Sequence, residues 1–178
     1  YSRAELHIPL VIDGREIITS HVEVGIDPSA EGGKWYDYCV ARSAEIDTAV
    51  ATARSAVGEW SSLGALARGE ILARAAIEMQ AERALTIAVM SRDAGKSYSE
   101  ADPEVSEAID FARYYSLSAR EKEFDSTPVG VVLVVPPWNF PYAIPAGGVC
   151  AALAAGNTVI LKPAPQSVAT AWHLVQQL

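Results

Sequence analysis

The stretch Val129-Gly-Val-Val-Leu-Val-Val-Pro-Pro-Trp-Asn-Phe-Pro141 decides the fold class. Its apolar run does not alternate with polar residues, which predicts a strand covered on both faces, and the two adjacent prolines end it. The small residues of 145–155 predict a packed helix that ends at Gly156-Asn157, and Thr158–Leu161 predicts a second buried strand. Ser167 then begins a helical pattern that reaches Leu178. Strand, helix, strand and helix in this order predict a parallel βαβα unit.

The expected sheet also predicts where a ligand binds. Ligands of open parallel sheets lie beyond the carboxyl ends of the strands, and these ends are 136–140 and 162–167. Only two parallel strands are visible in the pattern, so we expect an incomplete sheet and a chain that is a fragment of a longer protein.

The residues before this unit form two further parts. Residues 1–40 predict a strand-rich arm, with apolar Leu6–Ile12, a hairpin signal at Asp13-Gly14 and returning strands within 17–26. Residues 43–115 predict helices. The first has Ser43 as its N-cap and Glu45 in its first turn, the second runs from Ala65 to Arg92, and the third starts after Asp102-Pro103.

Composition restricts the class of function. The chain has 178 residues and a formal net charge of −8, which disfavours nucleic acid as a partner. Its longest apolar stretch, Val129–Val135, is too short to cross a bilayer, and its N-terminus has no signal-peptide pattern. Two cysteines, Cys39 and Cys150, form no disulfide framework, so we expect a reducing, cytoplasmic setting. Three scattered histidines, His7, His21 and His173, have no metal-ligand spacing, and no metal site is expected.

Few residues carry chemistry by their own pattern. Asn139, between two aromatic residues at a strand end, can offer its side-chain NH2 to a developing oxyanion; the simpler interpretation is a turn with a hydrogen-bonded Asn. Lys162 can reach a phosphate or a ribose, or it is a solvated Lys leaving a strand. Gly95-Lys96-Ser97 is no phosphate-binding loop, because the required upstream Gly is Met90. Cys150 is expected to be a packed small residue, not a nucleophile.

The charges of the third helix have a simpler interpretation still. Glu104, Glu107 and Asp110 mark one side of it, and a solvated face is the default expectation for such a row.

Taken together, these motifs resemble the aldehyde dehydrogenase family. Val131–Phe140 with Pro141 resembles its strand and P-W-N-F-P turn, and 151–163 resembles its next helix, strand and K-P element. The segment Glu104-Val-Ser-Glu-Ala-Ile-Asp-Phe-Ala-Arg-Tyr-Tyr115 resembles a subgroup, the L-glutamate γ-semialdehyde (1-pyrroline-5-carboxylate) dehydrogenases. In many bacteria these form the C-terminal module of a bifunctional proline-utilisation protein.

The resemblance implies an α/β fold: residues 1–178 would be the N-terminal portion of a doubly wound, Rossmann-like NAD(P)-binding domain, with 129–178 as the start of its βαβα cofactor-binding unit and the catalytic domain absent. Asn139 would be the side-chain donor of the oxyanion hole. The cofactor, NAD with NADP left open, would lie along Val135, Pro136, Pro137 and Trp138, with Lys162 at its ribose. Phe140 would border the aldehyde tunnel, and Glu107 would lie near the substrate pocket. The implied reaction is NAD-dependent oxidation of the semialdehyde to L-glutamate through a cysteine thiohemiacetal and a thioester.

The chain departs from the family pattern at several points. Three residues after Lys162 the family usually has an acidic residue that binds ribose hydroxyls; here Pro165 stands there, and Gln166 is its possible substitute. The linker 116–127 is short for an oligomerisation hairpin, although the parent protein is expected to be a homo-oligomer. The family's nucleophilic Cys, its Glu base and its glycine-rich turn would lie beyond Leu178, so we expect this chain alone to be inactive.

Two alternatives remain open. One is an aldehyde dehydrogenase for another substrate, such as succinic semialdehyde or betaine aldehyde. The other is a non-catalytic, degenerate domain that binds a nucleotide or a partner, which Pro165 favours.

Overall fold

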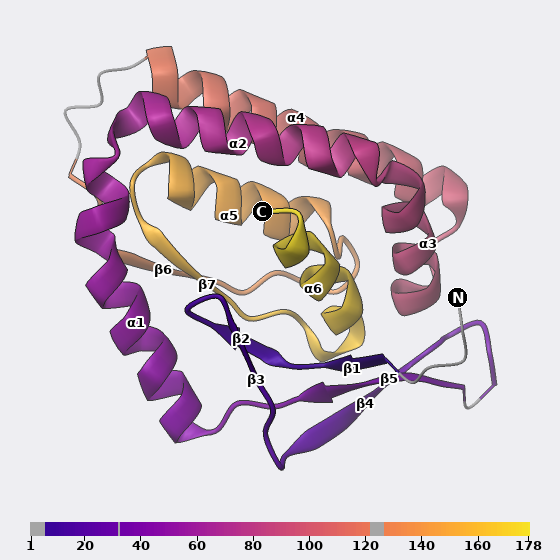
Figure 1. Cartoon of the computed structure of the whole chain (residues 1–178). Helices are drawn as coiled ribbons and strands as arrows, with labels where there is room; N and C mark the ends of the chain where they lie inside the picture. The colour runs from indigo at the N-terminus through magenta and orange to yellow at the C-terminus, as the bar shows by residue number, and fades with distance from the viewer. Residues whose placement is uncertain (1–5, 32, 122–126) are drawn as a thin grey trace.

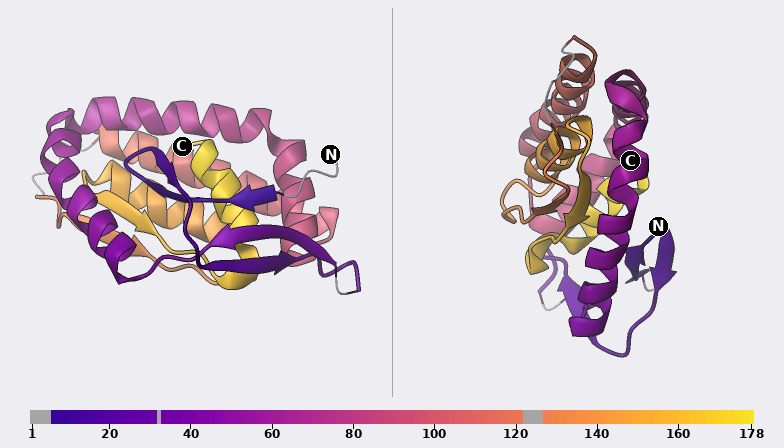
Figure 2. Two further views of the ribbon diagram at one scale, coloured as in Figure 1. Left: turned by 60° about the horizontal axis from the view of Figure 1, so that its bottom comes forward. Right: turned by 90° about the vertical axis from the view of Figure 1, so that its left-hand side faces the viewer.

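The computed structural model describes residues 6–31, 33–121 and 127–178. The expectations for residues 1–5, for Gly32 and for the 122–126 part of the linker lie outside the described residues. Figures 1 and 2 show the strands of the N-terminal arm at one side of the molecule and the helix pair α2 (Gly64–Ala81) and α4 (Tyr98–Glu121) at the opposite side. None of the described helices is long and apolar enough to cross a membrane.

The arm consists of short strands, as predicted. β2 (Leu10–Ile12) and β3 (Arg15–Ile17) form an antiparallel hairpin. Its two turn residues, Asp13 and Gly14, have φ values of 58° and 68°, so the hairpin prediction is confirmed. β1 (Leu6–Ile8), β5 (Lys34–Cys39) and β4 (Val22–Ile26) form a separate three-stranded sheet in that order, with β1 parallel and β4 antiparallel to β5.

A glycine in this sheet makes room for an aromatic ring. A Cβ added to Gly25 on β4 would lie 2.0 Å from the ring of Tyr36 on the neighbouring strand. The ring therefore crosses directly over the glycine, and Tyr36 is buried with an exposed fraction of 1%. Its hydroxyl donates to Asp93 of α3 (Arg83–Ala94) at 2.8 Å, which ties the arm to the helices.

The first predicted helix is α1 (Ser43–Ser62), and its position is confirmed. The N-cap residue is Arg42, one residue before the predicted Ser43. The Arg42 N–H donates to the Glu45 carboxylate at 2.8 Å, so the acidic residue of the first turn acts as expected.

The predictions for the next two helices were wrong at their boundaries. The segment predicted as a single helix from 65 to 92 forms two helices, α2 and α3. They are separated by Glu82, whose φ and ψ of −94° and 12° lie outside the helical range. The third predicted helix begins at Tyr98 and not after Pro103, because Ser97 and Glu100 form a cap: the Ser97 N–H donates to the Glu100 carboxylate at 3.0 Å. Pro103 is tolerated in the second turn because Ser99, whose carbonyl loses its N–H partner, is exposed.

The C-terminal part is the predicted parallel unit. β6 (Val131–Val134) pairs in parallel with β7 (Thr158–Leu161), and α5 (Ala143–Ala154) connects them. A 3₁₀ turn, η1 (Pro165–Ser167), and α6 (Val168–Gln176) follow, with Ser167 at the N-cap of α6 as predicted. This α/β architecture confirms the expected fold class.

The prediction that β6 is covered on both faces was wrong for the described residues. Val134 packs against α5, where a Cβ added to Gly148 would lie 3.0 Å from its side chain. Leu133 and Val135 point to the other side, with exposed fractions of 59% and 56%. The described residues therefore cover one face of this strand and leave the other to solvent.

The core lies where α2, α4 and α5 pack together (Figure 1). Its buried side chains include Leu72, Met79, Met90, Ile109 and Tyr142. A second cluster joins the arm to α6 through Ile8, Tyr36, Tyr38 and Ala169. Because Leu174 of α6 belongs to the first cluster, this last helix contacts both cores.

Candidate functional site

The carboxyl ends of β6 and β7 lie side by side. In the parallel register Val134 is opposite Leu161, and the Lys162 N–H donates to the Val134 carbonyl at 2.9 Å. The backbone pairing therefore continues one residue beyond β7 and brings Lys162 next to Val135. The predicted site residues of 135–140, Lys162 and Gln166 thus come from segments that leave one edge of the sheet.

Asn139 lies in the turn between β6 and α5. It is exposed, and within the described part of the chain its side chain makes no hydrogen bond. Its neighbours Trp138 and Phe140 are also partly exposed, with fractions of 52% and 44%. These features favour an available side-chain donor over the simpler interpretation of a hydrogen-bonded Asn between packed aromatic residues.

Pro136 and Pro141 bracket this turn and are buried, whereas Pro137 is exposed. The turn is therefore anchored at both ends, and the residues between the anchors face solvent.

A buried carboxylate holds the end of the turn. Glu104 of α4 accepts the N–H groups of Tyr142 and Ala143 at 2.9 and 3.1 Å, and its other oxygen forms a salt bridge with Lys96. Its exposed fraction is 3%, so the expectation of a solvated side chain was wrong for this residue.

A signal for this burial was present in the sequence. Ala101, Val105, Ala108 and Ala112 are buried, and Glu104 lies three residues after the first of them and four before Ala108. At helical spacing this places Glu104 on the apolar stripe. The contact from Lys96, which follows the end of α3, had no signal in the sequence beyond its own charge.

Lys162 offers positive charge at the strand end. Its side chain is exposed, and the ammonium donates to the carbonyl of Pro163 at 3.0 Å. An ammonium has three donors, so two remain for hydroxyl or phosphate oxygens of a ligand. Pro165 begins η1 and brings no side-chain acceptor, whereas the amide of Gln166, also exposed, offers one.

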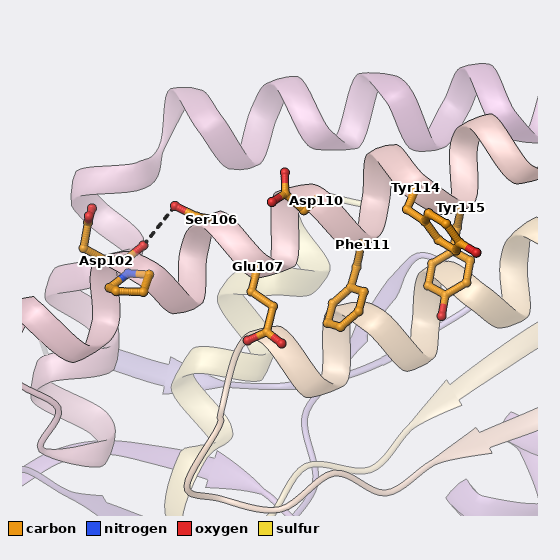
Figure 3. A pocket seen from close by; sticks show the side chains of 8 residues that line it. Asp102, Ser106, Glu107, Asp110, Phe111, Tyr114 and Tyr115 are labelled. Carbon is orange, nitrogen blue, oxygen red and sulfur yellow. Dashed lines mark hydrogen bonds between the residues drawn. The ribbon is translucent and has the colours of Figure 1, made fainter.

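Glu107 lies in a hollow along α4. The hollow is lined by α4 residues between Asp102 and Tyr115. Figure 3 shows Glu107 and Phe111 pointing toward the N-terminal end of α5, whereas Asp110 points away from it. Glu107 is exposed and lies one turn after Glu104, which contacts α5 directly.

Both cysteines are buried, and the Cys150 thiol does not have the character of a nucleophile. Burial raises the pKa of the Cys150 thiol to about 12, so this thiol stays protonated at neutral pH. Cys39 is also buried, with its sulfur 3.5 Å from the His7 Nε2. Across the described residues there is no group of three or more His, Cys, Asp or Glu side chains arranged to hold a metal ion.

The residues at the ends of β6 and β7 belong to a segment that matches a known protein family. The sequence model of the family described as "Aldehyde dehydrogenase family" matches residues 19–178. The chain belongs to the aldehyde dehydrogenase family. This confirms the resemblance carried by the turn around Asn139 and by the K-P element at Lys162.

The matching relatives of the family also fit the subgroup indicated by Glu104–Tyr115. A protein of Bacillus pumilus named 1-pyrroline-5-carboxylate dehydrogenase is 35% identical over 184 residues, which cover 96% of this chain and 36% of that protein. A Bacillus subtilis protein named 1-pyrroline-5-carboxylate dehydrogenase 2 is 34% identical with the same coverage. The chain therefore spans about a third of the length of these curated relatives.

Solved structures of the family agree with the fold. The 1-pyrroline-5-carboxylate dehydrogenase from Thermus with bound NAD has a TM-score of 0.93 and 30% identity, covering 97% of this chain and 36% of that one. Proline utilization A from Bdellovibrio bacteriovorus has a TM-score of 0.93 and 32% identity, covering 98% of this chain and 20% of that one. The fold described above is thus that of the N-terminal part of the aldehyde dehydrogenase fold.

Proposed function

We propose that the protein to which this chain belongs oxidises L-glutamate γ-semialdehyde to L-glutamate with NAD+ as the hydride acceptor, in the catabolism of proline. The observation that carries the proposal is the exposed Asn139, which lies in the turn that follows β6, the strand whose end pairs with Lys162. The matched relatives named 1-pyrroline-5-carboxylate dehydrogenase support the substrate, and the Thermus enzyme with bound NAD supports the cofactor.

The residues of this chain would divide the work as follows. The Asn139 side-chain NH2 would donate to the oxygen of the aldehyde as negative charge develops on it, which lowers the barrier of the attack. Lys162 would donate to hydroxyls of the nucleotide ribose, with the Gln166 amide as a further donor or acceptor. Val135, Pro136, Pro137 and Trp138 would line the dinucleotide, Phe140 would border the aldehyde, and Glu107 would lie near the substrate. NAD+, when bound, supplies the hydride acceptor of the reaction.

The fit of the cofactor to these residues is partial. The Lys162 ammonium and the Gln166 amide are exposed, so both can reach a ligand. Pro165 removes the carboxylate that the family usually offers to ribose hydroxyls, which weakens the discrimination against a 2′-phosphate. NADP therefore stays within the proposal as a second cofactor. We further propose that the protein is a homo-oligomer of the cytoplasm. Within this chain, a strand-rich arm and a helical part would precede the βαβα start of the cofactor-binding domain.

The test is an assay of the protein that carries this chain. NADH formation is followed by its absorbance with L-glutamate γ-semialdehyde, and the Asn139→Ala variant is measured beside it. We expect activity with the unmodified protein and a loss of kcat of about 10²–10³-fold in the variant, as for removal of other oxyanion donors. A Gln176→Ala variant, altered at an exposed position on α6, is the control.

The outcomes separate the alternatives. Oxidation of succinic semialdehyde or betaine aldehyde, with none of glutamate semialdehyde, would move the substrate and keep the family chemistry. Binding of NAD+ without oxidation of any of the three aldehydes would favour the degenerate binding domain, to which the acceptor-free Pro165 already points.

A further inference from the structure

The ion pair between Lys96 and Glu104 contacts the residues that follow Asn139 in its turn. Glu104 is almost fully buried, and the Lys96 side chain has an exposed fraction of 13%. Removing two charges from water costs free energy, and apolar side chains of similar size often stabilise such a place equally well. The charges of this pair are therefore weak evidence for a gain in stability, and a role in positioning the neighbouring turn is considered for them.

We propose that Lys96 and Glu104 are positioning residues that together fix the location of the Asn139 amide for the reaction. The inference rests on the proposed function, because it takes Asn139 as the donor to the developing oxyanion. Neither residue needs to touch the substrate for this role.

Glu104 acts on the C-terminal side of the turn. Its Oε1 accepts the N–H groups of Tyr142 and Ala143, which are the N-cap and first residue of α5. The first N–H groups of a helix have no partner within it, and a negative charge at this end is favoured by the helix dipole. Glu104 thus supplies from α4 the cap that α5 lacks in its own sequence, since Tyr142 makes no side-chain cap bond.

Lys96 acts on the residue next to Asn139. Its ammonium lies 4.4 Å from the centre of the Phe140 ring, within the range of a cation–π contact. Because the same ammonium is paired with Glu104, the ring and the start of α5 are held by one pair of charges. Asn139 lies between the buried Pro136 and these contacts.

The position of Asn139 depends on its neighbours, because its own side chain makes no hydrogen bond within the described residues. An oxyanion donor must lie 2.7–3.1 Å from the position that the oxygen will occupy. A displacement of about 1 Å costs roughly 10²-fold in rate. A loosened turn would therefore lower the rate without removing any catalytic group.

The test is a double-mutant cycle in the protein that carries this chain, with Glu104→Gln, Asn139→Ala and the two combined. Gln keeps one oxygen acceptor of similar size but removes the charge opposite Lys96. We expect Glu104→Gln to lower kcat about 10- to 100-fold with the KM for NAD+ unchanged. In the Asn139→Ala background the same change should lower kcat less than about twofold, because the donor that it positions is gone. Glu78→Gln, which neutralises an exposed carboxylate on α2, should leave kcat unchanged.

Hydrogen exchange supplies a readout that does not depend on activity. The amides of Tyr142 and Ala143 should exchange faster in Glu104→Gln, while the buried amide of Thr170, which donates to Asp93, keeps its protection. If Glu104→Gln does not fold, the pair variant Lys96→Met with Glu104→Gln removes both charges together, and its kcat and exchange are expected to change in the same directions.

Two results would overturn the proposal: losses of kcat that multiply fully in the combined variant, or unchanged exchange at Tyr142 and Ala143. A lack of aldehyde oxidation in the unmodified protein is a different result. It would remove the proposed function and the catalytic purpose of the pair, while the exchange rates would still decide whether Glu104 holds the turn.

Discussion

Lys162 is the residue at which cofactor binding can be tested apart from chemistry. Its ammonium is exposed at the end of β7 and donates to one carbonyl, that of Pro163. Lys162→Met should raise the KM for NAD+ about tenfold, which corresponds to one lost hydrogen bond from a charged donor. Because the donor acts on the bound nucleotide and not on the reacting carbon, kcat should change little. Equal losses of kcat and kcat/KM would contradict this assignment.

His173 gives a prediction for the dependence of stability on pH. It is buried on α6, with its Nε2 2.9 Å from the Thr86 hydroxyl, and burial lowers its pKa although the Glu82 carboxylate opposes this. The unfolded chain, with the ordinary His pKa of 6.5, therefore takes up a proton first as the pH falls. The free energy of unfolding should therefore decrease as the pH is lowered below about 6.5.

Urea unfolding at pH 7.5 and pH 5 measures this loss, with His173→Gln as the comparison. The Gln variant retains an amide for Thr86 but does not titrate, so its loss between the two pH values should be smaller. His7 and His21 are present in both proteins and do not affect the difference. An equal loss in the two proteins would assign the pH dependence to other groups.

At this scale the sequence predicted the residues that follow the strands and missed those that support them. Val135–Phe140 and Lys162 were predictable because an apolar strand leads directly into each. Lys96 and Glu104 were not, because their partners, Phe140 and the first residues of α5, are brought to them by the packing of α4 against α5. A side-chain pair between two elements has no local pattern.

Three elements of the molecule meet at Asp93. The carboxylate of this α3 residue accepts the hydroxyl of Tyr36 from β5 and, at 2.7 and 2.8 Å, the backbone N–H and hydroxyl of Thr170 from α6. Burial raises the pKa of Asp93, and these donors oppose the rise. Asp93→Ala would leave several buried donors without an acceptor and should cost about 3 kcal/mol of unfolding free energy.

The matched variant is Asp93→Asn, whose oxygen still accepts from part of this set, so a smaller loss of about 1–2 kcal/mol is expected. Denaturant unfolding of both variants checks the order. Equal losses would mean that the space filled by the side chain matters and the hydrogen bonds do not.

The helices and strands differ in how well their boundaries could be predicted from local sequence patterns. β6, α5, β7 and α6 were predictable because apolar strands, small residues and Gly156-Asn157 delimit them locally. The break at Glu82 was not, since the residues around it continue a helical pattern and no Gly or Pro marks it. The spacing of Ser97 and Glu100 is a capping signal that indicates the start of α4. Pro103 is the stronger local signal, and it led to a later predicted boundary.

The whole molecule leaves one apolar side of its parallel sheet open. Leu133 and Val135 are more than half exposed, and among the described strands β6 has β7 as its single neighbour. An unpaired strand edge with exposed apolar side chains promotes association. The isolated 178-residue chain should therefore form oligomers as its concentration rises in sedimentation experiments.

The double variant Leu133→Ser with Val135→Ser should shift this association to higher concentration. Leu66→Ser, which alters an apolar residue that is 61% exposed on α2, is the control and should leave it unchanged. An equal effect of both changes would mean that general surface hydrophobicity drives the association and that the sheet does not.

The three-way contact at Asp93 also sets an order of events during synthesis. Thr170 leaves the ribosome 77 residues after Asp93, which at 5–20 residues per second is a delay of about 4 to 15 s. Through this interval Tyr36 can already reach Asp93, but the donors of α6 do not yet exist. The contact between the arm and α3 can therefore form before α6 has been synthesised, and the hydrogen bonds of Asp93 are completed only when Thr170 is available.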